Sequence, residues 1–224
     1  MTTQSMTEWL IYEKEISVEK ENKRNLILET VKDTILTEGY SKISINKITS
    51  KCNISKGSFY TYFTSKEEML SAIIDEYKEL IVKILEDSTK YSKSLDEFLD
   101  RFIRYRHSLN PNDLKSELTL INLRKNLEII DEKNFQKLIS INSLFCNTVK
   151  ENLKKYTDFN EKEIENYSII LFGVRKIFVI TDTIKFEENS VEIRNVDELK
   201  SLLESEETQK NVEFIVECMK KILK

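Results

Sequence analysis

The 224-residue sequence contains only one proline and three glycines, so the residues that break helices and form tight turns are scarce. An all-β protein needs many such turns, and their shortage therefore favours long helices. There is no run of about 18 apolar residues, which excludes a membrane-spanning helix. The N-terminus also lacks the basic start and apolar run of a signal peptide. We expect an all-α protein of the cytoplasm that makes no contact with a membrane.

Residues that carry catalytic and metal chemistry are also rare. His107 is the only histidine, and the cysteines at 52, 146 and 218 are far apart in the sequence. No nucleophile–base set, phosphate-binding loop or metal-ligand cluster is evident, which argues against an enzyme and against a metal or a cofactor. We expect reduced cysteines, with Cys146 in apolar packing, and we expect His107 at the surface or at the rim of a pocket.

Acidic residues are missing from one window of an otherwise acidic chain. Between Gly39 and Lys66 there is no Asp or Glu, and the lysines there are Lys42, Lys47, Lys51, Lys56 and Lys66. The whole chain has a net charge of −4, so these five positive charges leave −9 for the remainder. Charge segregated in this way is typical of a surface that binds a polyanion. Taken alone, a run of lysines is usually only a solvated face, and it indicates a phosphate-binding surface here because it lies beside a capped short helix.

Capping residues divide this part of the chain into helices. Residues 20–38 have one apolar stripe at helical spacing, and Gly39 ends that helix because glycine readily adopts a left-handed conformation. Ser44 is an N-cap candidate for a short helix. Asn53 follows that helix and tolerates a left-handed turn.

A second short helix is predicted at 55–62, with Ser55 as its N-cap and a hydrophobic staple between Ile54 and Phe59. Ser65, with Glu68 three residues later, forms a capping box that begins a long helix at 66–86. Two short helices joined by a tight turn over about twenty residues have the spacing of a helix-turn-helix motif.

The segment SKGSFYTYFTSKEEML, at 55–70, resembles the DNA-binding domain of TetR-family transcriptional regulators. The similarity extends over about residues 20–85, and the rest of the chain matches only in being helical and of suitable length. Thr49 and Cys52 stand where the family usually has smaller residues, and Asn53 stands where it usually has glycine.

This resemblance implies an all-α homodimer that binds a palindromic double-stranded DNA operator. It also implies a repressor that a small molecule, bound in the C-terminal domain, releases from DNA. The implied domains are an N-terminal extension at 1–19, a helix-turn-helix domain at 20–66 and a ligand-sensing and dimerisation domain at 67–224.

The helix at 55–62 is the expected reader of the DNA major groove. Its N-terminus offers free N–H groups and a positive dipole end to phosphate, and Gly57 lets the backbone approach the duplex. Phe59 and Phe63 are expected in the core. The expected DNA-binding residues are Ser44, Lys47, Ser55, Lys56, Gly57, Ser58, Tyr60, Thr61, Tyr62 and Lys66.

The remainder of the chain is predicted to be helical, with amphipathic segments at 95–105, 114–130, 135–156, 161–184, 196–203 and 212–223. The segment at 161–184 is apolar on two sides, so both sides are expected to be covered. We expect this helix and the one at 212–223 to form a four-helix bundle with their symmetry mates, where Gly173 permits close approach.

The expected effector is a small hydrophobic molecule held by helices at 95–156 and 161–184, and the helix at 66–86 would transmit its binding. The expected pocket walls are Phe98, Phe102, Tyr105, Phe145 and Phe172. Arg175 interrupts an apolar run, where it could pair across a dimer, meet an acidic ligand or extend its head group to water. An alternative function is a DNA-binding adaptor that recruits a protein partner, which a filled core with an exposed apolar patch would favour.

Overall fold

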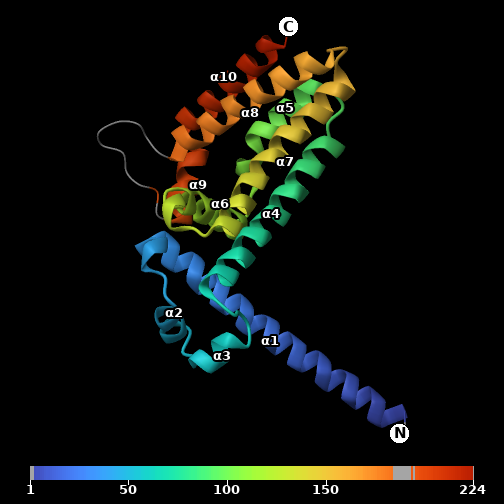
Figure 1. The fold of residues 1–224 in the computed structure, drawn as a ribbon. Coiled ribbons are helices and arrows are strands. Elements are labelled where there is room, and N and C mark those ends of the chain that lie inside the picture. The colour runs from blue at the N-terminus through green and yellow to red at the C-terminus, as the bar shows by residue number, and fades with distance from the viewer. Residues whose placement is uncertain (1–2, 184–192, 194, 224) are drawn as a thin grey trace.

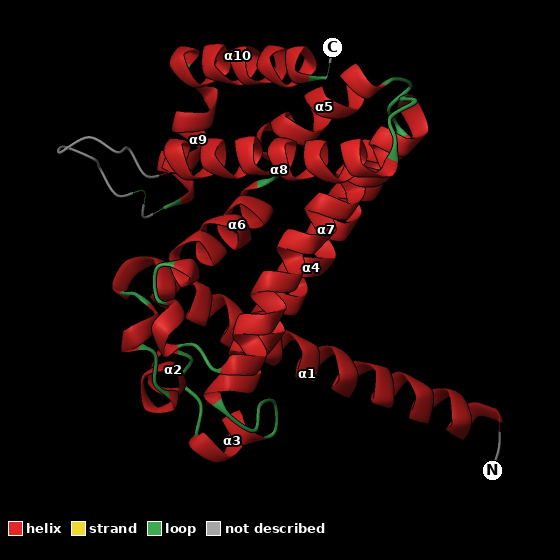
Figure 2. Cartoon of the chain, turned by 45° about the horizontal axis from the view of Figure 1, so that its top comes forward, coloured by secondary structure: helices red, strands yellow, loops and turns green. Residues whose placement is uncertain are grey.

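The computed structural model describes the backbone of residues 3–183, 193 and 195–223, and the side chains of these residues except 3–12 and 178–183. This part of the chain is all-α, with no strand, as Figures 1 and 2 show. Its α-helices are α1 (Thr3–Glu38), α2 (Ile45–Lys51), α3 (Lys56–Tyr60), α4 (Lys66–Lys90), α5 (Leu95–Arg104), α6 (Pro111–Arg124), α7 (Glu132–Tyr156), α8 (Glu161–Thr183), α9 (Val196–Glu204) and α10 (Glu206–Ile222). Short 3-10 turns follow α1, α5 and α6.

Helix α1 is longer than the predicted helix at 20–38, because the N-terminal segment continues it without a break. Side chains 13–23 are exposed, and burial begins at Ile27 and Leu28, which are each 1% exposed. The N-terminal half of α1 therefore projects away from the body of the molecule (Figure 1). The helix ends before Gly39, whose φ of 86° is the positive value that a glycine adopts without strain.

The molecule has two ends, which α4 connects. Helices α2 and α3 lie at one end, while α8 and α10 lie side by side at the other (Figures 1 and 2). Helix α4 begins beside α3, packs along α7 and also contacts α1, α5 and α6. A movement of α4 would therefore change the packing at both ends.

The hydrophobic core is continuous between these ends. The main cluster includes Phe59 and Phe63 of the helix-turn-helix region together with Phe98 and Phe145 of the other end. A second, smaller cluster places Leu36 of α1 against leucines of α6 and α9. The two ends consequently share packed apolar side chains in addition to the chain that links them.

As far as Ile177, helix α8 is buried on one side only within the protomer. Ile164 and Leu171 face the core, whereas Ile169, Ile170 and Ile177 are exposed. The predicted second apolar side is thus present and uncovered as far as Ile177, and Ile184 lies outside the described residues. Helix α10 begins at Glu206, earlier than predicted, because Ser205 accepts a hydrogen bond from the Thr208 N–H and so caps it.

Candidate nucleic-acid interface

The helix-turn-helix is built from local signals that the sequence already carries. The Ser44 hydroxyl accepts a hydrogen bond from the Lys47 N–H at 3.2 Å and caps α2. The Ser55 hydroxyl accepts one from the Ser58 N–H at 3.0 Å and caps α3. Between them Asn53 has a φ of 53°, so it makes the left-handed turn that was expected of it.

Helix α3 is shorter than the predicted helix at 55–62. It runs over Lys56–Tyr60, Thr61 is its C-cap, and Tyr62 lies in the turn that follows. The Thr61 hydroxyl donates to the Ser58 carbonyl at 2.7 Å and thereby stabilises the helix end.

The next cap is half of the predicted capping box. The Ser65 hydroxyl accepts from the Glu68 N–H, whereas the Glu68 carboxylate accepts from the Thr64 N–H at 2.5 Å instead of returning to Ser65. Position 64 is one residue before the cap, so the carboxylate ties down the approach to α4. These two hydrogen bonds fix the start of α4, which follows α3 in the chain after a short loop.

Helix α3 has a buried side and an exposed side. Phe59 is 0% exposed and Phe63 is 2% exposed, as predicted. The residues exposed from this segment are Ser55, Lys56, Gly57, Tyr60 and Thr61, while Ser58 and Tyr62 are half-buried. Tyr62 packs against the main core, so much of its ring is used for packing.

Gly57 stands at the second position of α3, where the helix N–H groups have no intrahelical partner. A Cβ placed at Gly57 would lie 3.7 Å from its nearest neighbour, the Ser55 Oγ, which is an ordinary contact. The fold of the protomer therefore leaves room for a side chain here. The absence of one exposes the backbone at a helix end that attracts phosphate.

Glu38 reduces the free charge of the lysine window. Its carboxylate pairs with the ammonium groups of Lys47 and Lys51, the latter at 2.9 Å. Hydrogen bonds from these two lysines, Lys47 first, lower the pKa of the Glu38 carboxyl to about 2. The sequence window excludes acids between 39 and 66, but the fold brings one in from just outside it.

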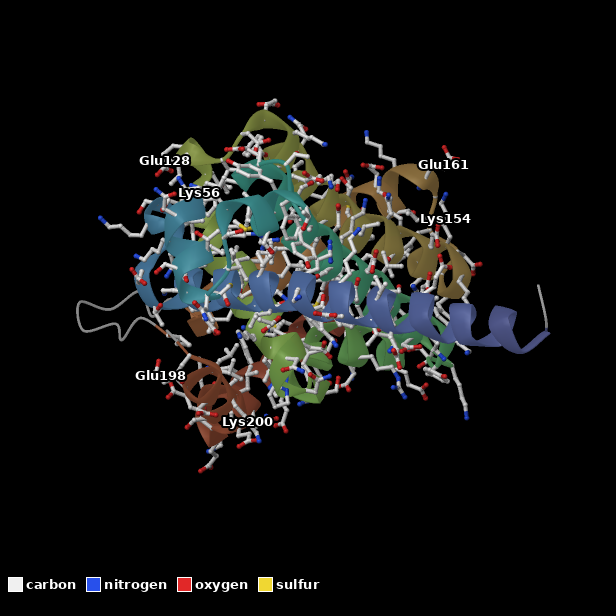
Figure 3. The ribbon with its side chains drawn as sticks, turned by 90° about the horizontal axis from the view of Figure 1, so that it is seen from below. Lys56, Glu128, Lys154, Glu161, Glu198 and Lys200 are labelled. Carbon is white, nitrogen blue, oxygen red and sulfur yellow. The ribbon has the colours of Figure 1, made fainter. Side chains whose placement is uncertain are left out.

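The other lysines of the window differ in exposure. Lys66 is half-buried with its Nζ 4.1 Å from the centre of the Tyr40 ring, and burial lowers the pKa of its ammonium group. Lys42 and Lys56 are exposed and have no ion-pair partner among the described residues. Figure 3 shows Lys56 far from Lys154, which lies near the C-terminal end of α7. Of these two lysines, Lys56 is the first residue of α3.

The expected effector walls lie in the C-terminal part of the molecule, on α5, the 3-10 turn that follows it, α7 and α8. Phe98, Phe102, Tyr105 and Phe145 are buried in the core, and Phe172 is half-buried. The rings of Phe102 and Phe145 meet edge to face with centroids 6.1 Å apart. The cavity that Phe145 and Phe172 line has a volume of about 20 Å³. It has room for about one water molecule in this conformation.

Arg175 does not extend to water, so that interpretation of the sequence is wrong. The residue is 6% exposed, and its guanidinium group lies 3.6 Å from the centre of the Phe145 ring. It donates a hydrogen bond to the Tyr105 hydroxyl at 2.7 Å. Its position in an apolar run reflects burial among aromatic rings, where a guanidinium group is attracted by the ring face.

Sequence reasoning missed the polar residues around Arg175. The Glu117 carboxylate of α6 accepts hydrogen bonds from the hydroxyls of Tyr77 and Tyr105, and the Arg106 Nε lies 3.6 Å from it. Burial raises the pKa of Tyr105 to about 12, so this hydroxyl stays protonated and donates a hydrogen bond to Glu117. The only signal in the sequence was a single acid within the apolar period of α6, which also fits a surface position.

The other two residues considered for a chemical role, His107 and Cys146, are half-buried and contact neighbouring groups of the protein. His107 is half-buried, its Nδ1 lies 3.2 Å from the Arg104 carbonyl, and burial lowers its pKa. Cys146 is half-buried between α7 and α8, with its Sγ 3.7 Å from the Ser168 hydroxyl. Among the described residues, no group of three or more His, Cys, Asp and Glu side chains could hold a metal ion. No helix within the described ranges has the length and apolar character that crossing a bilayer requires.

Comparison with known proteins agrees with this geometry. Residues 27–73 match the family described as bacterial regulatory proteins, tetR family. An uncharacterized HTH-type transcriptional regulator of Bacillus subtilis, YuxN, is 34% identical over 92 residues, which are 38% of this chain and 32% of YuxN. The chain therefore matches about a third of that relative's length.

Solved structures resemble the fold of nearly the whole chain. SCO4454, a TetR-family transcriptional regulator from Streptomyces coelicolor, superimposes with a TM-score of 0.64 and 14% identity over 91% of this chain and 95% of its own. AibR, in a complex with isovaleryl coenzyme A and operator DNA, gives a TM-score of 0.55 and 16% identity over 80% of this chain and 94% of its own.

The match at 27–73 coincides with the structural unit derived above from caps and burial. It runs from Ile27, the first buried residue among the described side chains of α1, through α2 and α3 into the first turns of α4. The family consists of DNA-binding transcriptional regulators and not of enzymes. The sequence match, the helix-turn-helix geometry and the all-α fold therefore agree that residues 27–73 form a domain similar to that of the tetR family of bacterial regulatory proteins, within a fold like that of SCO4454.

Proposed function

We propose that the protein is a ligand-responsive transcriptional repressor that binds a palindromic DNA operator as a homodimer. In this proposal α3 of each protomer lies in the major groove. A small molecule bound among α5–α10 and the C-terminal part of α4, which we call the regulatory half, releases the dimer from DNA. The protein would act in the cytoplasm, where bacterial chromosomal DNA is found.

The observation that carries the proposal is the exposed side of α3. Lys56, Gly57, Tyr60 and Thr61 are all exposed at or next to a capped helix that is held from behind by buried Phe59. A helix presented in this way suits the major groove, where its N-terminal residues meet base edges and phosphates. The Lys56 ammonium group has no ion-pair partner among the described residues, whereas the Thr61 hydroxyl also donates a hydrogen bond to the Ser58 carbonyl.

The other candidates divide by exposure. Ser44 and Ser55 use their hydroxyl oxygens as caps, so they would contact phosphate with the remaining hydrogen-bonding capacity. Lys47 and Lys66 would serve as backbone contacts that are weakened by Glu38 and by partial burial, respectively. Tyr62 and Ser58 would contribute less than Tyr60 and Thr61, because they are half-buried.

The proposed dimer interface is the exposed apolar face of α8 and α10. Ile170 and Ile177 of α8 lie at helical spacing with Gly173 between them, and Phe214 of α10 is 68% exposed. A Cβ at Gly173 would meet nothing within 4 Å in the protomer, so a second helix could approach closely there. Two-fold symmetry at this face would match a palindromic operator.

Small-molecule control is proposed in preference to recruitment of a protein. AibR provides the precedent in a fold of this kind, since it was crystallised with both an acyl coenzyme A and operator DNA. In this chain, buried polar groups gather beside the expected pocket walls, and the exposed apolar patch is accounted for by the dimer.

The proposal is tested by selecting genomic DNA fragments that the full-length protein retains and then measuring binding to them against salt concentration. Affinity should fall steeply with salt, because each neutralised phosphate releases counterions. Lys56→Ala should weaken binding and reduce the salt slope by about 1 per protomer. Lys154→Ala, which removes an exposed lysine at the far end of the molecule, is the matched control and should bind as the wild type does. Equal slopes and affinities for wild type and Lys56→Ala would refute the assignment of α3.

A further inference from the structure

The regulatory half buries more positive than negative charge at one place. Arg106 is 2% exposed and Arg175 is 6% exposed, and the buried carboxylate beside them is that of Glu117. Glu117 also accepts hydrogen bonds from the hydroxyls of Tyr77 and Tyr105. One carboxylate thus serves two hydroxyls and a guanidinium group, which leaves Arg175 without a neutralising partner.

The contacts of Arg175 are incomplete. Its Nη2 donates to the Tyr105 hydroxyl, and its guanidinium group rests on the Phe145 ring, but its buried Nε has no hydrogen-bond partner among the described residues. The three guanidinium nitrogens of Arg106 are likewise buried without hydrogen bonds. Burying a charge is costly unless it is paired and hydrogen-bonded, so native proteins seldom keep such groups unless they have a use.

Arg175 lines the cavity of about 20 Å³ described above. The side chains around this cavity include three cations and one anion, and they come from α4, α6, α7 and α8: Tyr77, Glu117, Arg124, Asn142, Phe145, Phe172, Arg175 and Lys176. Lys176 is exposed, while Asn142 and Phe172 are half-buried, so these three can move outward and widen the cavity. The widened site would offer cationic and amide donors beside two aromatic rings.

We propose that the effector carries a carboxylate or a similar oxyanion on an apolar body, and that Arg175, Arg124 and Lys176 bind this anion while Phe145 and Phe172 contact the body. This inference rests on the ligand-responsive function proposed above and specifies the chemistry of its ligand. It replaces the purely hydrophobic effector expected from the aromatic side chains alone. A guanidinium group is the side chain best suited to a carboxylate, because it can donate two parallel hydrogen bonds.

The position of the site also couples binding of the anion to the DNA-binding end. Tyr77 belongs to α4, which begins beside α3, and its hydroxyl is bonded to Glu117 of α6. An anion next to Arg175 repels the Glu117 carboxylate and weakens the link between α4 and α6. Binding of the acid would therefore favour a different position of α4, and this difference between the two states is what lets a ligand shift the population.

The test compares acids with uncharged amides of the same shape. Octanoate, benzoate, octanamide, benzamide and inorganic phosphate are added at millimolar concentration to the full-length protein without DNA, and the melting temperature and binding isotherm are measured. We expect octanoate or benzoate to raise the melting temperature and to bind at least about tenfold more tightly than its amide, since a charge-assisted pair contributes about 1.5–3 kcal/mol. Phosphate shows whether an oxyanion suffices without an apolar body.

Variants then assign the anion to this cavity. Arg175→Gln should abolish the preference for acids. If Arg175→Gln fails to fold, Arg124→Gln and Lys176→Gln replace it in the test. Arg124 is half-buried and Lys176 is exposed, so these substitutions should not prevent folding, and each should weaken the preference for acids. Lys162→Gln, which removes another exposed lysine of α8, is the control and should bind acids as the wild type does.

Either of two results would overturn the proposal. One is equal binding of each acid and its amide, or no binding of any probe. The other is an acid preference that survives in the folded variants of the cavity. DNA binding is measured separately on the same preparations. If the wild-type protein does not bind operator DNA when no acid is present, the proposed function is refuted, but the anion site is not.

Discussion

At the scale of single residues, ion pairing decides which lysines can meet DNA. Glu38 pairs with Lys47 and Lys51, and hydrogen bonds from these lysines lower the pKa of its carboxyl to about 2. Lys42 and Lys56 are exposed without such a partner. The number of lysines in the sequence therefore overstates the positive charge that the surface presents.

Replacing Glu38 with glutamine should strengthen DNA binding. Glu38→Gln removes one negative charge and frees two lysines, so the salt slope should become steeper by about 1–2 per protomer if both then neutralise a phosphate. Binding to operator and to random DNA should rise together, because phosphate contacts carry no sequence information. Titrations at several salt concentrations measure both effects.

The control for Glu38→Gln is Glu206→Gln, which breaks an exposed pair with Lys210 on α10 and should leave DNA binding unchanged. If Glu38→Gln binds DNA as weakly as the control does, Lys47 and Lys51 do not face the phosphates.

A substitution of Gly57 by alanine, which adds one methyl group, should affect DNA binding without affecting folding. Gly57→Ala should fold as well as the wild type or be stabilised by up to about 1 kcal/mol, because alanine is the better helix former and the added Cβ meets only an ordinary contact at 3.7 Å. DNA binding should weaken, since the methyl group lies where the backbone approaches phosphate. Thermal unfolding and operator titration are the two measurements. Unchanged operator affinity would mean that the N-terminus of α3 does not touch the duplex.

At the scale of elements, much of the helix-turn-helix could be predicted because its signals are local. Ser44, Ser55 and Ser65 cap helices where expected, and Gly39 and Asn53 have the positive φ values expected of them. Each of these positions is determined by neighbours within four residues. The end of α3 was misjudged because Thr61 reads as helical in sequence but bonds back to Ser58.

Interactions between distant residues could not be predicted from the sequence. Glu117, Tyr105 and Arg175 come from different elements, and only the packing of α4, α6, α7 and α8 brings them to one cavity. The aromatic residues Phe98 and Phe102 were recognised, but hydrophobic spacing does not distinguish a filled core from an open pocket. The pairing of Glu38 with Lys47 was hidden for the same reason, since it joins α1 to α2.

The exposed face of α8 and α10 gives a prediction about assembly. Phe214→Glu places a charge at the exposed aromatic residue of α10 and should convert the proposed dimer to monomer, because a carboxylate is costly to bury in an apolar interface. Operator affinity should fall by about 10²-fold or more, since the two half-sites are then bound independently. Sedimentation and operator titration measure these changes.

Ile139→Glu is the matched control for this substitution. It changes an apolar residue of α7 that is 42% exposed and lies outside α8 and α10. It should leave both assembly and operator affinity unchanged. A wild-type protein that sediments as a monomer at micromolar concentration, or a Phe214→Glu variant that remains dimeric, would contradict the interface.

At the scale of the whole molecule, and in addition to the continuous core, two features of the described residues link the helix-turn-helix end to the regulatory half. One is α4, which runs from α3 into the regulatory bundle (Figure 1). The other is the contact of α1 with α6, where Lys115 pairs with Glu29 at 2.8 Å and with Asp33 at 2.7 Å. Leu36 adds apolar packing at the same junction. Tyr77 of α4 is hydrogen-bonded to Glu117 of α6, so a ligand bound beside Glu117 would change the position of both helices.

The junction between α1 and α6 should therefore control operator affinity without touching DNA. Lys115→Ala removes both ion pairs and should cost about 1 kcal/mol or less in stability, because the two acids are largely exposed. The recognition helices of the dimer would then be held less firmly at one spacing, and operator affinity should fall by about 0.5–2 kcal/mol, while binding to random DNA changes little. Lys150→Ala is the matched control, because it breaks a Lys–Glu pair of 2.6 Å between α7 and α8 that lies within the regulatory half. Titrations with operator and with random DNA distinguish the outcomes, and equal operator affinity in the two variants would show that α4 alone carries the coupling.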